Sequence, residues 1–135
     1  MQHPSVPDAM SLPPSPLTRI GIVMFGVASV ARSIAFYRDL LGLKLQTEFP
    51  GFAFFEVGGV TLVVSEPLAK ALGAGPGDAE VIFPVEDVRA AYEALRTRGL
   101  VFSQEPRNVS GPMWAANFAD PDGHRLSIFG PERKA

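Results

Sequence analysis

The sequence predicts an α+β fold built from two βαβββ modules. Three observations lead to this prediction: short apolar, β-branched segments bounded by turn residues, two amphipathic helical segments that each follow a capping residue, and a repetition of this whole pattern along the chain. The first module is expected over residues 19–66 and the second over residues 78–131. A chain of 135 residues has room for one such domain, over residues 19–131, and not for two independent ones.

The first module is expected to begin with a strand and a helix. Residues 20–27 are apolar and largely β-branched, as in a buried strand. Ser29 is a suitable N-cap for a helix that reaches about Leu40, and Gly42 suits a left-handed C-cap. The apolar positions of this helix recur at helical spacing: Val30, Ile34, Tyr37 and Leu41.

The rest of the first module is predicted to be three short strands, at residues 43–48, 52–57 and 60–65. Gly58 and Gly59 predict a tight hairpin turn between the last two of them. Residues 67–77 are rich in proline and glycine, so they predict a loop that joins the two modules.

The second module repeats this order. Residues 80–85 predict a strand, Asp87 caps the following helix and Gly99 ends it. The apolar positions of this helix are Val88, Ala91, Tyr92 and Leu95. The remaining strands are expected at residues 100–103, 113–119 and 124–129. Residues 120–123, Asp-Pro-Asp-Gly, are a strong turn signal before the last strand.

An internal alignment supports a duplication of the module. Residues 27–37 match residues 85–95 at a constant offset of 58, and residues 59–62 match residues 123–126 at an offset of 64. The offset changes only in loops, where insertions are tolerated. Chance similarity between two βα segments is the alternative, but it would not keep the offset through a whole helix and also keep the hairpins in order.

Composition excludes several classes of function. The net charge of -2 and the scattered lysines and arginines argue against nucleic-acid binding, which needs a basic face. The chain has no cysteine, so disulfides, a thiolate nucleophile and cysteine-bound zinc are excluded. No apolar run approaches the roughly 18 residues that a membrane helix needs. Residues 1–18 are proline-rich and lack the features of a signal peptide, so they predict a flexible tail, with Met10 as an alternative start, and a cytosolic protein.

Residues 27–43 (VASVARSIAFYRDLLGL) and 118–124 (FADPDGH) resemble the vicinal oxygen chelate superfamily. This superfamily groups glyoxalases, fosfomycin- and bleomycin-resistance proteins and extradiol dioxygenases. The resemblance covers about residues 19–131. It implies that the two modules pair into a curved mixed sheet, which forms a cup around a small ligand. Metal-dependent members place four ligands in the cup, usually His or Glu, on the first and last strand of each module.

The resemblance assigns these metal-ligand positions to Ile22, Val63, Glu80 and Ser127. Ile and Val cannot coordinate a metal, and a neutral serine hydroxyl is a poor ligand. One carboxylate does not hold a catalytic divalent ion, because such sites use about three protein ligands. A shift of one residue along each strand brings in no ligand, and the two histidines lie in the tail (His3) and at the turn (His124). We therefore expect no metal and no other cofactor.

Glu80 is the strongest candidate for a functional side chain. If the alignment holds, its carboxylate points into an apolar cup, where burial disfavours the charged form unless a cation or donor pairs with it. It would bind a cationic or amine-bearing ligand, or act as a general base. The alternatives are a strand-end carboxylate in solvent beside Asp78, or a buried one that pairs with Ser127 or Arg125.

Arg125 and Ser127 share a strand face by alternation, and either could donate to a ligand oxygen. The alternatives are a solvated charge at a strand end for Arg125 and a small polar filler for Ser127. If the 120–123 turn closes a regular hairpin, Trp114 and Phe118 lie on this same face. Trp114 would then stack on a planar or cationic ligand, and packing in the core is its alternative role.

Two residues of the first module are further candidates for the cup wall. Phe54 and Phe55 are adjacent in a strand, so one of them must face the cup. Met24 follows Ile22 by two positions, shares its face, and would give the wall some plasticity. The ligand-binding candidates are therefore Met24, Phe54, Glu80, Trp114, Arg125 and Ser127.

These features favour metal-independent binding of a small, partly aromatic or cationic molecule, as in bleomycin- and antibiotic-resistance proteins. The first alternative is a glyoxalase-like lyase or isomerase, or a dioxygenase, that uses Glu80 or an unconventionally held metal. The second is an interaction module without a ligand. Because modules of this superfamily often pair across a dimer interface, the resemblance also implies a homodimer.

Overall fold

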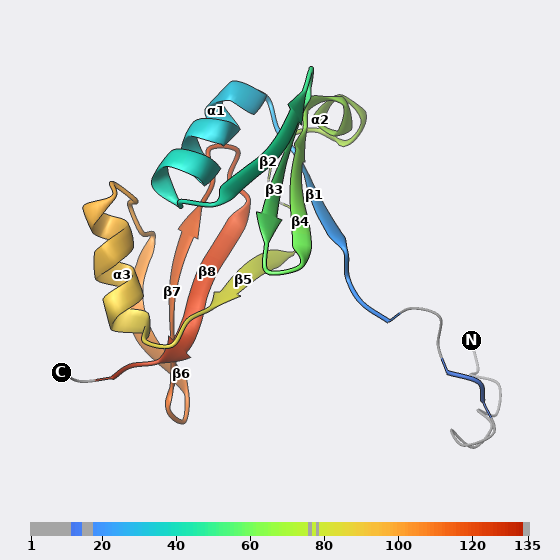
Figure 1. Ribbon diagram of the computed structural model, residues 1–135. Coiled ribbons are helices and arrows are strands. Elements are labelled where there is room, and N and C mark those ends of the chain that lie inside the picture. Colours follow the sequence, from blue (N-terminus) through green and yellow to red (C-terminus); the bar gives the residue numbers. More distant parts are fainter. Residues whose placement is uncertain (1–11, 15–17, 76, 78, 134–135) are drawn as a thin grey trace.

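The computed structural model describes residues 12–14, 18–75, 77 and 79–133. Its order of elements confirms two βαβββ modules (Figure 1). The first module consists of β1 (Ile22–Gly26), α1 (Val30–Ile34), a π-helical segment η2 (Ala35–Leu40), β2 (Lys44–Phe49), β3 (Phe52–Val57) and β4 (Val60–Ser65). Most of the expected tail over residues 1–18 lies outside the described residues, so the domain boundary stays a prediction.

A short helix, α2 (Glu66–Leu72), leads from the first module towards the second. The second module consists of β5 (Glu80–Pro84), α3 (Val88–Thr97), β6 (Gln104–Ser110), β7 (Met113–Ala119) and β8 (Arg125–Pro131). The strands expected at residues 52–57, 60–65 and 113–119 therefore have the predicted bounds.

The two modules form two four-stranded sheets with equivalent topology. The first sheet has the order β1-β4-β3-β2 and the second the order β5-β8-β7-β6, with a parallel first pair in each. Even the residue register agrees between them. The equivalent pairs are Ile22–Thr61 with Glu80–Arg125, and Met24–Val63 with Ile82–Ser127. This agreement confirms the internal alignment, including the equivalence of Ile22 with Glu80 and of Val63 with Ser127.

Both predicted N-caps are present. The Ser29 hydroxyl accepts a hydrogen bond of 3.1 Å from the backbone N–H of Arg32. The Asp87 carboxylate accepts from the N–H groups of Arg89 and Ala90, at 3.1 and 3.3 Å. Each side chain thus satisfies donors that the first turn of a helix leaves unpaired.

Two elements were predicted wrongly. Residues 67–77 begin with helix α2 rather than a loop, because the Ser65 hydroxyl caps it through the Leu68 N–H at 3.0 Å and Pro67 fits its first turn. The strand expected at residues 100–103 lies instead at Gln104–Ser110. This strand is largely exposed on both faces, at the edge of its sheet, so it lacks the alternation on which the prediction relied.

One core joins the two modules. It is formed by the helix-facing sides of both sheets together with α1, η2 and the start of α3. Its members include Val30, Ile34, Tyr37, Phe55, Leu62, Val64, Val88, Phe118, Leu126 and Ile128. Each sheet therefore turns one side towards this shared core and leaves the other side open. Within the described residues, no helix is both long and apolar enough to span a membrane.

Candidate functional site

The candidate site lies on the open sides of the two sheets, opposite the shared core. Because successive side chains of a strand point to opposite faces, every second residue faces the open side and the others face the core. In β1, Ile22 and Met24 face the open side and remain 60% and 43% exposed, whereas Val23 and Phe25 pack towards the core. In β5, Ile82 is 52% exposed on the open side, and Phe83 packs towards the core. Large apolar side chains thus stay uncovered on both open faces.

The open face of the first sheet is apolar and aromatic. Val63 pairs with Met24 on one side and with Phe54 on the other, so these three side chains form a row across three strands. The ring of Phe54 packs edge-on against Phe49, with centroids 5.9 Å apart, and lies 6.4 Å from that of Phe52. Met24 and Phe54 therefore share one face, as the sequence predicts, while Phe55 belongs to the core.

The open face of the second sheet carries a polar row. The Asn117 side chain donates a hydrogen bond of 3.0 Å to Oε2 of Glu80, and its own Oδ1 accepts one of 3.5 Å from Arg107. Asn117 also pairs with Ser127 in the register of β7 and β8. A carboxylate, an amide and a guanidinium thus cross the sheet, with the Ser127 hydroxyl beside them.

The structure gives Glu80 a partner that the sequence did not suggest. Glu80 is exposed on the open face of a single chain and pairs with Asn117 rather than with Ser127 or Arg125. The Arg125 guanidinium instead donates to the backbone oxygen of Gly77, at 3.3 Å. Asp78, the other expected neighbour, lies outside the described residues. The environment of Glu80 in one chain is therefore polar and open, not an enclosed apolar cup.

The expected position of Trp114 was wrong. Trp114 pairs with Gly130, and it packs against the core side of the sheet, not on the face of Arg125 and Ser127. The cause is a one-residue slip in the hairpin. The backbone N–H of Asp120 donates to the oxygen of His124 at 3.0 Å, so the turn closes at His124 and not at Gly123. Because side chains alternate, one extra loop residue moves a whole strand face to the other side.

The same slip explains why Asn117 was missed. With the hairpin closed one residue later, Asn117 moves to the open face and Phe118 joins the core. Arg107 lies in the edge strand β6, which was not predicted. No local sequence signal would have revealed Asn117, because its place opposite Ser127 follows only from the register of the hairpin in the structure.

The four positions where metal-dependent relatives hold their metal do not form a metal site in this chain. Ile22 and Val63 offer no donor atom, and Val63 and Ser127 are nearly inaccessible. Glu80 is left as one carboxylate, already bonded to Asn117. Among the described residues there is no group of three or more His, Asp and Glu side chains that could hold a metal ion. The residues present therefore do not fit a catalytic divalent ion.

The Asp-Pro-Asp-Gly turn holds the modules together rather than lining the site. His124 stacks on Phe25 with ring centroids 4.3 Å apart, and its Nε2 lies 2.8 Å from the backbone oxygen of Gly26. Asp122 accepts hydrogen bonds from the Ala28 N–H and the Arg32 guanidinium, at 3.1 and 2.9 Å. Every one of these contacts joins the second module to the start of the first.

Comparisons with known proteins agree with this architecture. The family model described as the Glyoxalase/Bleomycin resistance protein/Dioxygenase superfamily matches residues 19–128. A metallothiol transferase FosB from Staphylococcus haemolyticus is 38% identical over 47 residues, which are 35% of this chain and 34% of that protein. The chain therefore matches only about a third of the length of these curated relatives.

Solved structures extend the similarity to most of the chain. A glyoxalase/bleomycin resistance protein/dioxygenase from Nocardioides has a TM-score of 0.72 and 25% identity, over 93% of this chain and 90% of its own. Lactoylglutathione lyase from Agrobacterium tumefaciens has a TM-score of 0.66 and 19% identity, over 86% of this chain and 96% of its own. Because the lyase is only 19% identical, its likeness to this chain shows the fold alone.

Proposed function

The chain belongs to the Glyoxalase/Bleomycin resistance protein/Dioxygenase superfamily, and from this premise we propose that it binds a small, partly aromatic or cationic molecule without a metal ion. The observation that carries the proposal is the contrast between the two open faces. One face offers Phe54 and Met24, and the other offers the hydrogen-bonded pair of Glu80 and Asn117. An aromatic wall combined with one carboxylate suits a ligand with a ring and a positive charge.

We propose that a second copy of the chain completes the site. Both open faces turn away from the shared core, so one chain does not bring them together. The exposed Ile22, Met24 and Ile82 would be covered if the first sheet of one copy faced the second sheet of another. In a twofold homodimer this contact would occur twice, because the first sheet of each copy would face the second sheet of the other. It would also exclude water from Glu80 and strengthen any charge pairing there.

The names of relatives do not decide between binding and catalysis. The similarity to a metallothiol transferase covers 47 residues. Because Ile22 and Val63 supply no metal donor, a metal-dependent activity does not transfer to this chain with that similarity. A binding role requires no metal donor. It depends on the shape and polarity of the two faces, which Phe54 and the pair of Glu80 and Asn117 provide.

Thermal unfolding of the metal-stripped protein tests this proposal. The probes are bleomycin and smaller aromatic amines, each with and without EDTA, and Mn²⁺, Ni²⁺ and Zn²⁺ alone. We expect an aromatic cation to raise the melting temperature equally with and without EDTA. Strong stabilisation by a divalent ion that disappears on chelation contradicts the proposal.

Two variants locate the binding site. Phe54→Ala removes the aromatic wall, and Glu80→Gln removes the charge while keeping the shape of the side chain. Each is expected to weaken binding roughly tenfold, a change of about 1.4 kcal/mol. Glu86→Gln, at an exposed carboxylate outside the strands, is the matched control and should bind as the unmodified protein does. Equal binding by all three variants would place the ligand elsewhere.

A second candidate function is a lyase, isomerase or dioxygenase reaction in which Glu80 acts as a base. The exposed carboxylate favours this candidate, because Asn117 holds one oxygen and leaves the other available. The metal content of the purified protein and the turnover of Glu80→Gln separate the two functions. Bound stoichiometric metal, or a reaction abolished by this single substitution, would favour catalysis over binding.

A further inference from the structure

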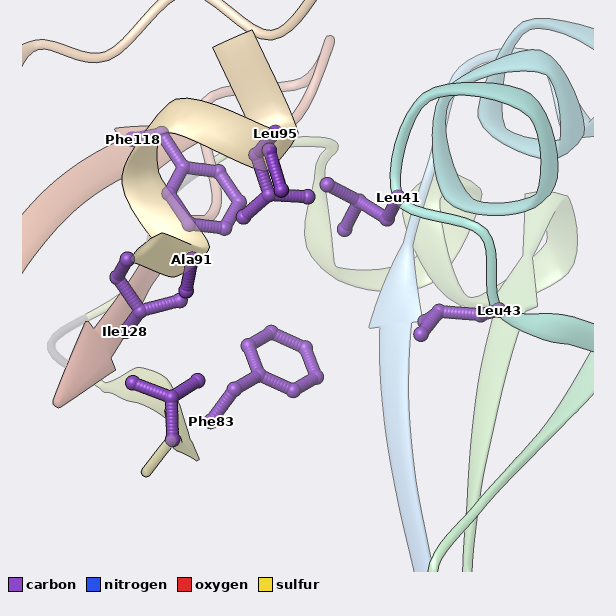
Figure 2. Close-up of a pocket in the computed structure, with 9 residues that line it drawn as sticks. Leu41, Leu43, Phe83, Ala91, Leu95, Phe118 and Ile128 are labelled. Carbon is purple, nitrogen blue, oxygen red and sulfur yellow. The ribbon is translucent and has the colours of Figure 1, made fainter. Parts of the chain in front are cut away.

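A separate apolar cavity lies between the modules, on the side of the second sheet that faces the core. Its volume is about 310 Å³, and every side chain that lines it is apolar. Figure 2 shows Leu41 and Leu43 of the first module on one side, with Ala91 and Leu95 of α3 and Phe83 of β5 on the other. Residues of both modules thus line the cavity, and neither Glu80 nor Asn117 is among them.

The walls of this cavity are incompletely covered. Phe118 and Ile128 in the second sheet are buried, but Phe83, Ala91 and Leu95 are only half-buried. Helix α3 has a clear apolar face, yet Val88 is its only buried residue. Protein cores are normally packed as densely as organic crystals. Uncovered apolar walls around a space of this size therefore indicate a place that an apolar group can fill.

The cavity is distinct from the proposed binding site. Phe83 lies next to Ile82 in β5 and so points to the opposite side of the sheet. Phe118 and Asn117 are separated in the same way in β7. A ligand on the open faces and a ligand in the cavity would have the sheet between them. This inference therefore goes beyond the proposed function and does not depend on it.

We propose that the cavity is a second binding site, for a small neutral apolar molecule with one to three rings or a short hydrocarbon chain. An enclosed engineered apolar cavity of about 150 Å³ binds benzene or xenon, and this cavity, which is partly open to solvent, is about 310 Å³. A charged or strongly polar ligand is excluded, because no side chain here could replace its hydrogen bonds to water. Binding covers Leu41 and Leu95 and clamps the modules together.

Fluorescence of the neutral probe N-phenyl-1-naphthylamine tests the proposal, because its emission rises in apolar surroundings. We expect saturable binding of one probe per chain. Ala91→Phe fills the cavity and should weaken binding at least tenfold. Ala90→Phe is the matched control, since Ala90 is the exposed neighbour on the same helix and does not line the cavity. Thermal unfolding checks that both variants fold, and Ala94→Leu at the cavity rim replaces Ala91→Phe if that variant does not.

Methyl NMR then locates the probe. We expect the signals of Leu41, Leu43 and Leu95 to shift on titration and those of Ile22 and Ile82 to stay unchanged. The reverse pattern, or equal affinity of the two phenylalanine variants, overturns the proposal. Loss of probe binding as the chain self-associates, followed by sedimentation, would show that a second copy occupies the cavity and would overturn it as well.

Discussion

The Tyr37 hydroxyl donates a hydrogen bond of 2.7 Å to Oδ2 of Asp120, across the boundary between the two modules. Tyr37 is fully buried, and the other Asp120 oxygen accepts from the backbone N–H groups of Asp122 and His124, at 3.0 and 2.8 Å. One carboxylate thus shapes the Asp-Pro-Asp-Gly turn and fixes that turn to η2. The turn is therefore part of the joint between the modules as well as a link between two strands.

Tyr37→Phe should destabilise the protein by about 1–3 kcal/mol, the usual cost of leaving a buried polar group without its partner. The unpaired group would be Oδ2 of Asp120, which remains buried after the substitution. Urea denaturation measures the change. Tyr92→Phe removes a hydroxyl from the half-buried tyrosine of α3 and is the control. Equal stability of the two variants would show that the hydrogen bond contributes nothing.

Stability should also fall at high pH through Tyr37. Burial, followed by the charge and the hydrogen bond of Asp120, raises the pKa of Tyr37 above its ordinary value near 10. Above about pH 10, the unfolded chain loses the tyrosine proton while the folded chain keeps it, so the free energy of unfolding decreases as pH rises. Tyr37→Phe should show a smaller decrease than the unmodified protein between pH 9 and 11. An unchanged slope contradicts this assignment.

His124→Ala should cost about 1–3 kcal/mol. The backbone oxygen of Gly26 can only accept, so Nε2 of His124 carries the proton of their 2.8 Å hydrogen bond. The substitution removes this bond and the stacking on Phe25, and it leaves a buried carbonyl without its donor. Calorimetry measures the loss. His124→Phe keeps a ring for stacking and should recover part of the stability, whereas identical melting of both variants would show that stacking contributes little.

Gly130→Ala should destabilise the second module by about 1–3 kcal/mol or more, the cost of overpacking. A Cβ at Gly130 would overlap the backbone oxygen of Val85, which cannot rotate away as a side chain can. The two strands β5 and β8 would therefore have to separate at this end. Chemical denaturation measures the change against Gly77→Ala, where a Cβ meets nothing within 4 Å. Similar effects of the two substitutions would contradict the close approach.

The sequence predicts the repeated architecture well because each module carries its own local signals. Ser29 and Asp87 mark the starts of the two long helical segments, and Gly58 and Gly59 mark the hairpin of the first module. These signals act over a few residues and do not depend on what the segment packs against. The equivalence of Ile22 with Glu80 follows from them, and with it the lack of metal donors at the family positions.

The faces of β7 could not be predicted because they depend on one hydrogen bond in the turn. Closing the hairpin at His124 instead of Gly123 moves Asn117 to the open face and Trp114 towards the core. Nothing in the Asp-Pro-Asp-Gly sequence distinguishes these two closures. What does distinguish them is tertiary, because His124 must reach the Gly26 carbonyl of the other module.

The open face of the first sheet should be an interface between two copies of the chain. Ile22 begins the edge strand β1 and is 60% exposed on this face. Ile22→Asp would place a charge against an apolar partner surface and should weaken self-association by several kcal/mol, given the cost of burying an unpaired charge. Val101→Asp is the control, because Val101 is 84% exposed in the loop after α3, beside Tyr92 and Phe102, and belongs to no strand of either sheet. Sedimentation equilibrium should show the control as a dimer and Ile22→Asp as a monomer. A monomeric unmodified protein, or equal dissociation of both variants, would remove the second copy from the proposed site and leave each open face to bind a ligand alone.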